Sequence, residues 1–159
     1  MNFRIGFGFD VHQLTETRDF WLGGIKIPHY KGGLGHSDAD VLIHTICDAL
    51  LGAANLGDIG KHFPDTAAEY KGIDSKILLK EVMLLVRNQG YEIGNIDSTI
   101  CLQTPKIGPY IPEMKKVLAS CMNIDIDQVS IKATTTEKLS FVGREEGVSA
   151  YATVLINKI

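Results

Sequence analysis

The sequence has few features of secreted, membrane-spanning or nucleic-acid-binding proteins. It holds three cysteines in 159 residues, and Cys47, Cys101 and Cys121 are too widely spaced for a CxxC metal pair or an obvious disulfide framework. No apolar run approaches the roughly 20 residues of a membrane span, and no apolar signal segment precedes the first predicted strand. A net charge of −3 argues against nucleic-acid binding, which normally needs a basic face. We therefore expect a cytoplasmic protein in a reducing compartment, with neither membranes nor nucleic acids as partners.

The rest of the composition is ordinary for a soluble globular protein. A length of 159 residues, with 45% hydrophobic and 22% charged residues, allows one sizeable core. The chain contains no internal repeat or low-complexity stretch. Residues 1–159 are therefore expected to form a single domain.

Apolar periodicity predicts strands interleaved with helices. A helix is expected from the capping run Ser37-Asp38-Ala39-Asp40 to about Ala54, with Asp38 and Asp40 in its first turn. Residues 57–66 have too many glycines for regular structure. Further helices are expected over 75–89 and 112–122, and strands over 3–12, 20–22, 25–27, 96–102, 129–133 and 148–156. This pattern predicts an α/β fold of the α+β sandwich type: a single mixed sheet with helices on one face and another subunit over the other.

The first strand carries the most informative residues. Its odd positions, from Phe3 to Val11, are all apolar and are expected to face the core. Asp10 and His12 share the opposite face with two glycines, which leave room for a ligand or another backbone. A carboxylate and an imidazole side by side supply two of the three protein ligands of a catalytic zinc site. The alternative is a polar pair at a strand end without a metal.

The third metal ligand is expected on the first helix. His44 lies at the edge of the predicted buried stripe, four residues from both Asp40 and Asp48. One ring nitrogen could bind the metal while the other donates to an acceptor such as Asp48. The alternative is a half-buried histidine that is only hydrogen-bonded.

Three segments have residues suited to phosphate or nucleotide binding. Thr134-Thr135-Thr136-Glu137-Lys138 follows a strand, where hydroxyls and backbone N–H groups can bind phosphoryl oxygens and a carboxylate can bind a divalent cation. Residues 57–65 could form a lid over a substrate. Residues 103–109 contain two prolines that stiffen a loop able to read a base edge. The alternatives are a charged turn, a surface loop and an ordinary strand-to-helix connection.

In this order, these motifs resemble the 2-C-methyl-D-erythritol 2,4-cyclodiphosphate synthase family. The resemblance covers about residues 4–158 and rests on residues 4–6, 8–12, 36–38, 40–44, 48–53, 56–60, 63–66 and 132–139. The chain departs from the family pattern at Ile107-Gly108, where a bulkier pair is common. It also has Ser140 in place of a commoner glycine, and Phe7 where a polar residue is frequent.

The resemblance implies a phosphorus–oxygen lyase of the non-mevalonate pathway of isoprenoid (terpenoid) biosynthesis. The 2-phosphate of 4-diphosphocytidyl-2-C-methyl-D-erythritol 2-phosphate would attack the β-phosphorus, giving the cyclic diphosphate and CMP. The attacking oxygen is already anionic, so positioning and metal electrostatics can supply most of the catalysis.

The resemblance also implies the cofactors and the catalytic groups. One zinc ion per subunit would be held by Asp10, His12 and His44, with a substrate phosphate oxygen at its open position. A second divalent ion, magnesium or manganese, would lie between Glu137 and the diphosphate. The implied catalytic residues are His36, Thr135 and Glu137.

The implied substrate site extends over several loops. Residues 63–66 would form a mobile lid, and residues 102–108 with Thr134 would recognise cytosine and the nucleotide phosphates. The implied substrate-binding residues are Asp10, His12, His36, Ser37, Asp58, Ile59, Gly60, Phe63, Pro64, Asp65, Thr66, Leu102, Gln103, Thr104, Pro105, Lys106, Ile107, Gly108, Thr134, Thr135, Thr136, Glu137, Phe141 and Arg144.

The family resemblance further implies a homotrimer with active sites between subunits and a central apolar channel that can hold an isoprenoid diphosphate. Two other functions are compatible with the residues. A zinc-dependent hydrolase of a nucleotide diphosphate would need a general base near the metal-bound water, and the sequence assigns none. A non-catalytic nucleotide-binding module with structural zinc would need a fourth protein ligand.

Overall fold

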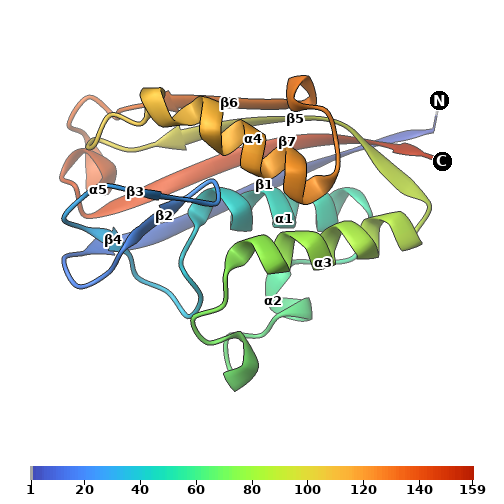
Figure 1. Cartoon of the computed structure of the whole chain (residues 1–159), viewed down its shortest axis with the longest axis horizontal. Coiled ribbons are helices and arrows are strands. Elements are labelled where there is room, and N and C mark those ends of the chain that lie inside the picture. Colours follow the sequence, from blue (N-terminus) through green and yellow to red (C-terminus); the bar gives the residue numbers. More distant parts are fainter. Residues whose placement is uncertain (1) are drawn as a thin grey trace.

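A five-stranded mixed sheet forms the frame of the computed structural model, which describes residues 2–159 (Figure 1). Strand β1 (Phe3–Thr15) is antiparallel to β7 (Gly147–Lys158), and β7 is antiparallel to β5 (Tyr91–Cys101). Strand β6 (Val129–Thr134) pairs with β5 in parallel, and the short β4 (Gly32–Gly33) pairs with β1. The order is β4-β1-β7-β5-β6, so the predicted mixed sheet is confirmed.

Three helices cover one face of this sheet (Figure 1). Helix α1 (Val41–Ala53) packs on β1 and β7, α3 (Ser75–Asn88) packs beside α1, and α4 (Ile111–Met122) packs on β6. The prediction of helices on one face is confirmed. No helix in the described part of the chain has the length and apolar character needed to cross a bilayer.

The remaining elements are short. Strands β2 (Phe20–Leu22) and β3 (Ile25–Ile27) form the predicted hairpin. Residues 57–66, predicted to be irregular, contain a four-residue helix that Asp58 caps by accepting from the Lys61 amide. The short helices are α2 (Ile59–His62), η1 (Ala68–Tyr70), η2 (Gly108–Tyr110), η3 (Ile126–Gln128) and α5 (Ser140–Gly143).

Helix α1 begins one residue after a buried aspartate. Asp40 is the N-cap: it accepts from the Ile43 amide at 3.0 Å and also from the Gly23 and Gly24 amides of the β2–β3 turn. The prediction that Asp38 and Asp40 lie in the first turn was wrong, because Asp40 is the N-cap before the first turn and Asp38 precedes it. The cap fixes α1 to the hairpin as well as to the sheet.

The two faces of β1 are arranged opposite to the prediction. A Cβ on Gly6 would lie 1.9 Å from the Ala49 carbonyl oxygen, and one on Gly8 would lie 2.0 Å from that of Thr45, so α1 lies directly on the glycine face. The apolar face is outside: Ile5 and Phe7 are 62% and 64% exposed. Alternation identified an apolar face, but the helix packs where the missing side chains allow close approach. The prediction that another subunit covers the apolar face stays a prediction.

Candidate metal centre

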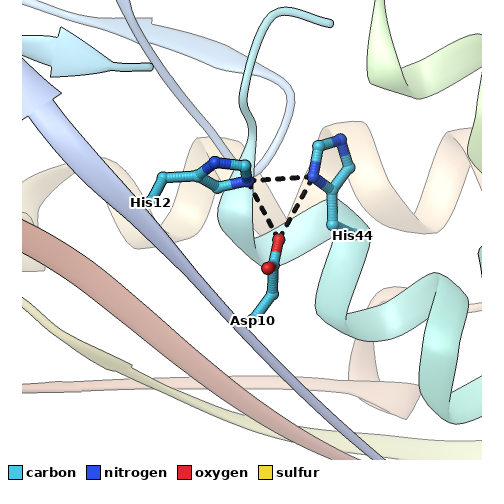
Figure 2. Close-up of side chains that lie close together, drawn as sticks. All are labelled: Asp10, His12 and His44. Atoms are coloured by element: carbon cyan, nitrogen blue, oxygen red, sulfur yellow. Dashed lines mark hydrogen bonds and ion pairs between the residues drawn. The ribbon is translucent and has the colours of Figure 1, made fainter. Parts of the chain in front are cut away.

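Three side chains from two elements converge beside the first turn of α1 (Figure 2). Asp10 and His12 come from β1, and His44 comes from α1. Asp10 Oδ2 lies 2.9 Å from His12 Nε2 and 3.2 Å from His44 Nδ1, and the two nitrogens are 3.1 Å apart. Within residues 2–159 this is the one group of three His, Cys, Asp or Glu side chains close enough to share an ion. The predicted convergence is confirmed, and the cluster could hold a metal.

The glycines of β1 explain how the cluster forms. Asp10 and His12 lie on the same strand face as Gly8, and that face is covered by α1. Because Gly8 has no side chain, the backbone of α1 at Thr45 approaches the strand closely, and the adjacent residue His44 comes within reach of the strand's polar side chains. The sequence left open whether a ligand or another backbone lies against the glycines of β1. The backbone of α1 lies there.

A backbone carbonyl determines which nitrogen of His12 is left to bind a metal. His12 Nδ1 lies 3.1 Å from the Leu34 carbonyl oxygen. A carbonyl only accepts, so Nδ1 carries the hydrogen and donates it. With Nδ1 committed to Leu34, the nitrogen left to bind a metal is Nε2, which points at Asp10 and His44. A metal at Nε2 would displace the proton that Nε2 shares with Asp10 in the metal-free chain.

Charge inside the cluster follows from burial and pairing. Burial opposes ionisation of Asp10, but hydrogen bonds from His12 and His44 outweigh it, so the pKa of Asp10 lies far below its ordinary value. Burial also disfavours the protonated form of His12, but the bond to Asp10 outweighs it and raises the His12 pKa. Asp10 is thus anionic at neutral pH, as a metal ligand must be.

The second nitrogen of His44 faces serines rather than the expected aspartate. His44 Nε2 lies 2.9 Å from Ser75 Oγ and 3.1 Å from Ser37 Oγ. The prediction that Asp48 accepts from His44 was wrong: Asp48 Oδ1 instead accepts from the Ile59 amide at 2.7 Å and so joins α1 to α2. Ser75 was missed because it is 31 residues from His44 and no local pattern connects them.

A cavity of about 430 Å³ opens beside the cluster. It is lined by His12 and His44 and by predicted substrate-binding residues: His36, Ser37 and residues 59–60 and 63–65. Asp58 and Thr66 are not among its lining residues; Asp58 is the N-cap of α2. His36 Nε2 donates a hydrogen bond to the Ala67 carbonyl oxygen at 3.1 Å, because a carbonyl oxygen can only accept. We call the Asp10–His12–His44 cluster, together with the residues that line this cavity, the metal half of the candidate site.

Several of the other predicted residues line a second cavity of about 270 Å³. Its lining includes residues 102–103, 105–108 and 134–135, and none of its residues lines the first cavity. We call residues 102–108 and 134–144 the nucleotide half. Thr104, Thr136, Glu137, Phe141 and Arg144 do not line this cavity, and the Arg144 side chain pairs with Glu146 at 2.7 Å. In one chain the two halves therefore form separate cavities.

Glu137 is exposed, and its backbone amide donates to Thr135 Oγ1 at 3.2 Å. It is not part of a cluster of three metal-ligating side chains in residues 2–159. The family resemblance places a second metal between Glu137 and the substrate diphosphate. Because the substrate would supply some of its ligands, this second metal stays a prediction.

Comparison with known proteins gives a consistent result over the whole chain. The model of the YgbB family matches residues 3–157. Two curated relatives, from Bacteroides fragilis and Bacteroides thetaiotaomicron, are named 2-C-methyl-D-erythritol 2,4-cyclodiphosphate synthase. They are 67% identical over 100% of both chains and 66% identical over 99% of both chains.

Solved structures agree in fold. A CDP complex of IspF from Plasmodium falciparum has a TM-score of 0.87 and 35% identity, covering 99% of this chain and 97% of that one. A CDP-bound 2C-methyl-D-erythritol-2,4-cyclodiphosphate synthase has a TM-score of 0.89 and 38% identity, covering 97% of this chain and 100% of that one.

Proposed function

The chain belongs to the YgbB family, and we propose on that premise that it acts as a 2-C-methyl-D-erythritol 2,4-cyclodiphosphate synthase. It would convert 4-diphosphocytidyl-2-C-methyl-D-erythritol 2-phosphate to the cyclic diphosphate and CMP, as a cytoplasmic phosphorus–oxygen lyase acting as one domain over residues 1–159. The observation that carries the proposal is the Asp10–His12–His44 cluster beside a cavity lined by the predicted substrate residues.

The donor set suits zinc. Two imidazole nitrogens and one carboxylate oxygen are the ligand types of catalytic zinc sites, which keep a fourth position open. With metal–ligand distances near 2.05 Å, a tetrahedral site has donor–donor edges of about 3.3 Å. The observed separations of 2.9, 3.1 and 3.2 Å are close to this value. When bound, zinc would supply positive charge and an open position for a phosphoryl oxygen.

The reaction forms one bond and breaks another at the β-phosphorus. An oxygen of the 2-phosphate forms the new P–O bond, the bond from the β-phosphorus to the bridging oxygen breaks, and CMP leaves with that oxygen. Residues of the chain would mainly position the two anionic groups. His36 and Ser37 line the cavity beside the cluster, where they can hold phosphate oxygens, and Thr135 would stabilise the transferring phosphoryl group.

The nucleotide half would bind the leaving group. Residues 102–108 and Thr134 line a cavity that we assign to cytosine and the nucleotide phosphates. Glu137 would hold the second divalent ion, magnesium or manganese, against the diphosphate. Asp58 and Gly60 would contact the ribose and erythritol hydroxyls, and residues 63–66 would close over them.

A homotrimer would bring the two halves together. Because the halves form separate cavities in one chain, a complete site needs the metal half of one subunit and the nucleotide half of another. The exposed apolar face of β1 supplies the surface for such an assembly. In the trimer this face would surround a central channel in which an isoprenoid diphosphate could bind.

The direct test is incubation of the zinc- and magnesium-loaded protein with the cytidylyl substrate. Cyclic diphosphate and CMP are the expected products, whereas linear diphosphate with CMP would show a hydrolase and overturn the proposal. We expect Asp10→Asn to lose bound zinc and to lower kcat/KM about 1000-fold, since the metal supplies several kcal/mol to the transition state. Asp19→Asn, which changes an exposed aspartate paired with Lys26, is the matched control and should keep full activity.

A further inference from the structure

His44 is oriented by contacts on the side away from the cluster. Its Nε2 lies 2.9 Å from the hydroxyl oxygen of Ser75, the first residue of α3, and this serine is fully buried. No pattern in the sequence connects the two residues, which are brought together where α3 packs on α1. The contact therefore exists only through the tertiary fold.

Ser75 is in turn held by a carboxylate. Asp38 accepts the Ser75 hydroxyl hydrogen at one oxygen, and its other oxygen accepts from the Ser75 amide at 2.9 Å. The Asp40 amide adds a third donor to Asp38, at 3.2 Å. A carboxylate surrounded by donors only accepts, so the single hydroxyl hydrogen of Ser75 is committed to Asp38.

This commitment determines the proton position on His44. With its hydrogen given to Asp38, Ser75 Oγ can only accept from His44, so His44 Nε2 carries the ring hydrogen. Nδ1, which faces Asp10 and His12, is then the nitrogen left to bind a metal, and a metal there would displace any proton that Nδ1 shares with Asp10. A neutral ring with its hydrogen on Nδ1 alone would leave Nε2 facing a Ser75 oxygen whose hydrogen is already given to Asp38, so two acceptors would be in contact.

We propose that Asp38 and Ser75 are positioning residues that hold His44 in the tautomer that binds a metal through Nδ1. This proposal rests on the proposed function, since it gives the pair a role in building the zinc site. Neither side chain belongs to the metal cluster. The contact chain runs from Asp38 through Ser75 to His44; Ser75 is fully buried, and Asp38 and His44 are partly buried.

The same arrangement has a consequence for the substrate cavity. Ser37 Oγ accepts from the Ala39 amide at 3.2 Å and lies 3.1 Å from His44 Nε2. Because His44 is the donor in this contact, the hydroxyl hydrogen of Ser37 is not needed by His44 and can point into the cavity that Ser37 lines. A phosphoryl oxygen is a suitable acceptor for it.

Zinc affinity, measured by competition with a chelator, tests the proposal without substrate. Ser75→Ala should weaken zinc binding roughly 10- to 100-fold, the usual cost of losing a partner of a metal-binding histidine. Ser98→Ala is the matched control: Ser98 is a buried serine whose hydroxyl donates to the Ser130 carbonyl, away from the cluster. Its zinc affinity should equal that of the wild type. Equal affinities for Ser75→Ala and Ser98→Ala would overturn the proposal.

A second measurement uses the unmodified protein and so does not depend on the folding of a variant. Nitrogen-15 NMR of the zinc-loaded protein should show His44 with its hydrogen on Nε2. A hydrogen on Nδ1 would overturn the proposal. Since neither measurement involves turnover, a protein that shows the expected tautomer and affinity but makes no cyclic product would refute only the proposed function.

Discussion

The two halves of the candidate site differ in how completely one chain builds them. In the metal half, the donor atoms are on a long strand and a buried helix and lie within 3.2 Å of one another. In the nucleotide half, residues 137–141 are exposed, and Glu137, Lys138 and Ser140 have φ values of 53°, 63° and 58°. A metal site needs its ligands to be held in fixed positions, and β1 and α1 hold Asp10, His12 and His44 in this way. Under the proposed function, nucleotide recognition would depend on this exposed loop and on a neighbouring subunit that completes the site.

The strongest test of this division mixes two inactive variants. His44→Gln damages only the metal half and Glu137→Gln only the nucleotide half, so each alone should retain less than about 1% of wild-type activity. In a randomly mixed trimer, one site in four combines an intact metal half with an intact nucleotide half from its neighbour. Co-expression should therefore restore about a quarter of wild-type kcat.

Native mass spectrometry provides the control for the mixing experiment, because it shows whether trimers containing both variants are present. If such trimers form and activity is not restored, the two halves act within one chain, and the proposed site between subunits is wrong. A mixture of His44→Gln with Asp10→Asn, both in the metal half, should remain inactive under the same conditions.

Local periods made Asp10, His12 and His44 candidates for one metal cluster, and the family resemblance favoured the metal over the alternatives. A strand puts Asp10 and His12 on one face, and helical phase puts His44 at the edge of a buried stripe. The bounds of the long helices and of β6 and β7 were predicted to within two residues for the same reason, but β5 begins at Tyr91 instead of residue 96 and β1 runs to Thr15 instead of residue 12. The contacts of Asp48 and Ser75 were not, since each depends on which element packs against α1.

The side of the sheet covered by helices could not be predicted from the first strand. Alternation shows that one face of β1 is apolar, and an apolar face is equally suited to a helix of the same chain or to another subunit. The decisive residues were Gly6 and Gly8, whose missing side chains allow α1 to approach. Helix α2 was missed because four residues are too few to show a helical period.

The closeness of α1 to β1 can be tested by adding one methyl group. Gly8→Ala would place a Cβ 2.0 Å from the Thr45 carbonyl oxygen and 2.9 Å from the Ala49 nitrogen, both backbone atoms that cannot rotate away. We expect a loss of about 3 kcal/mol in the free energy of unfolding, measured by urea denaturation. Zinc affinity should also fall, because His44 moves with the helix.

Gly52→Ala, on helix α1, is the matched control for Gly8→Ala on strand β1. A Cβ there meets no atom within 4 Å, so the substitution should stabilise the protein by about 0.5–1 kcal/mol through helix propensity. If Gly8→Ala is as stable as wild type, the metal half does not depend on close strand–helix packing.

The strain of the nucleotide half predicts a stabilising substitution. Ser140, at the start of α5, has a φ of 58°, a conformation that costs about 1–2 kcal/mol for a residue with a Cβ. Ser140→Gly should therefore raise the free energy of unfolding by about 1 kcal/mol. Asn123→Gly, at the end of α4 with a φ of 53°, should gain less, since asparagine tolerates this conformation. Loss of stability in Ser140→Gly would show that the Ser140 side chain contributes more than its backbone strain costs.

The smallest effect concerns Asp48, which joins α2 to the metal half. Burial raises the pKa of Asp48, and repulsion from Asp58 and Asp10 adds to it, despite the bond from the Ile59 amide. The folded protein thus binds this proton more tightly than the unfolded chain does, so the free energy of unfolding falls as pH rises from 3.8 through the raised pKa. Asp48→Asn keeps the acceptor for Ile59 and removes the charge. After allowance for solvent screening, it should be about 0.5 kcal/mol more stable than wild type at pH 7, and this advantage should disappear below the ordinary aspartate pKa.

Asp97, on strand β5, provides a control with a pH dependence of opposite sign. The bond from Lys132 lowers the pKa of Asp97, so ionised Asp97 stabilises the fold, and this contribution is lost as pH falls through its lowered pKa. Asp97→Asn should therefore lose stability at neutral pH, while Asp48→Asn gains it. Urea denaturation of metal-free protein across a pH series measures both. If Asp48→Asn were the less stable variant at neutral pH, the charge of Asp48 would be holding α2 on α1, and the rigid frame of the metal half would extend to the segment that lines its cavity.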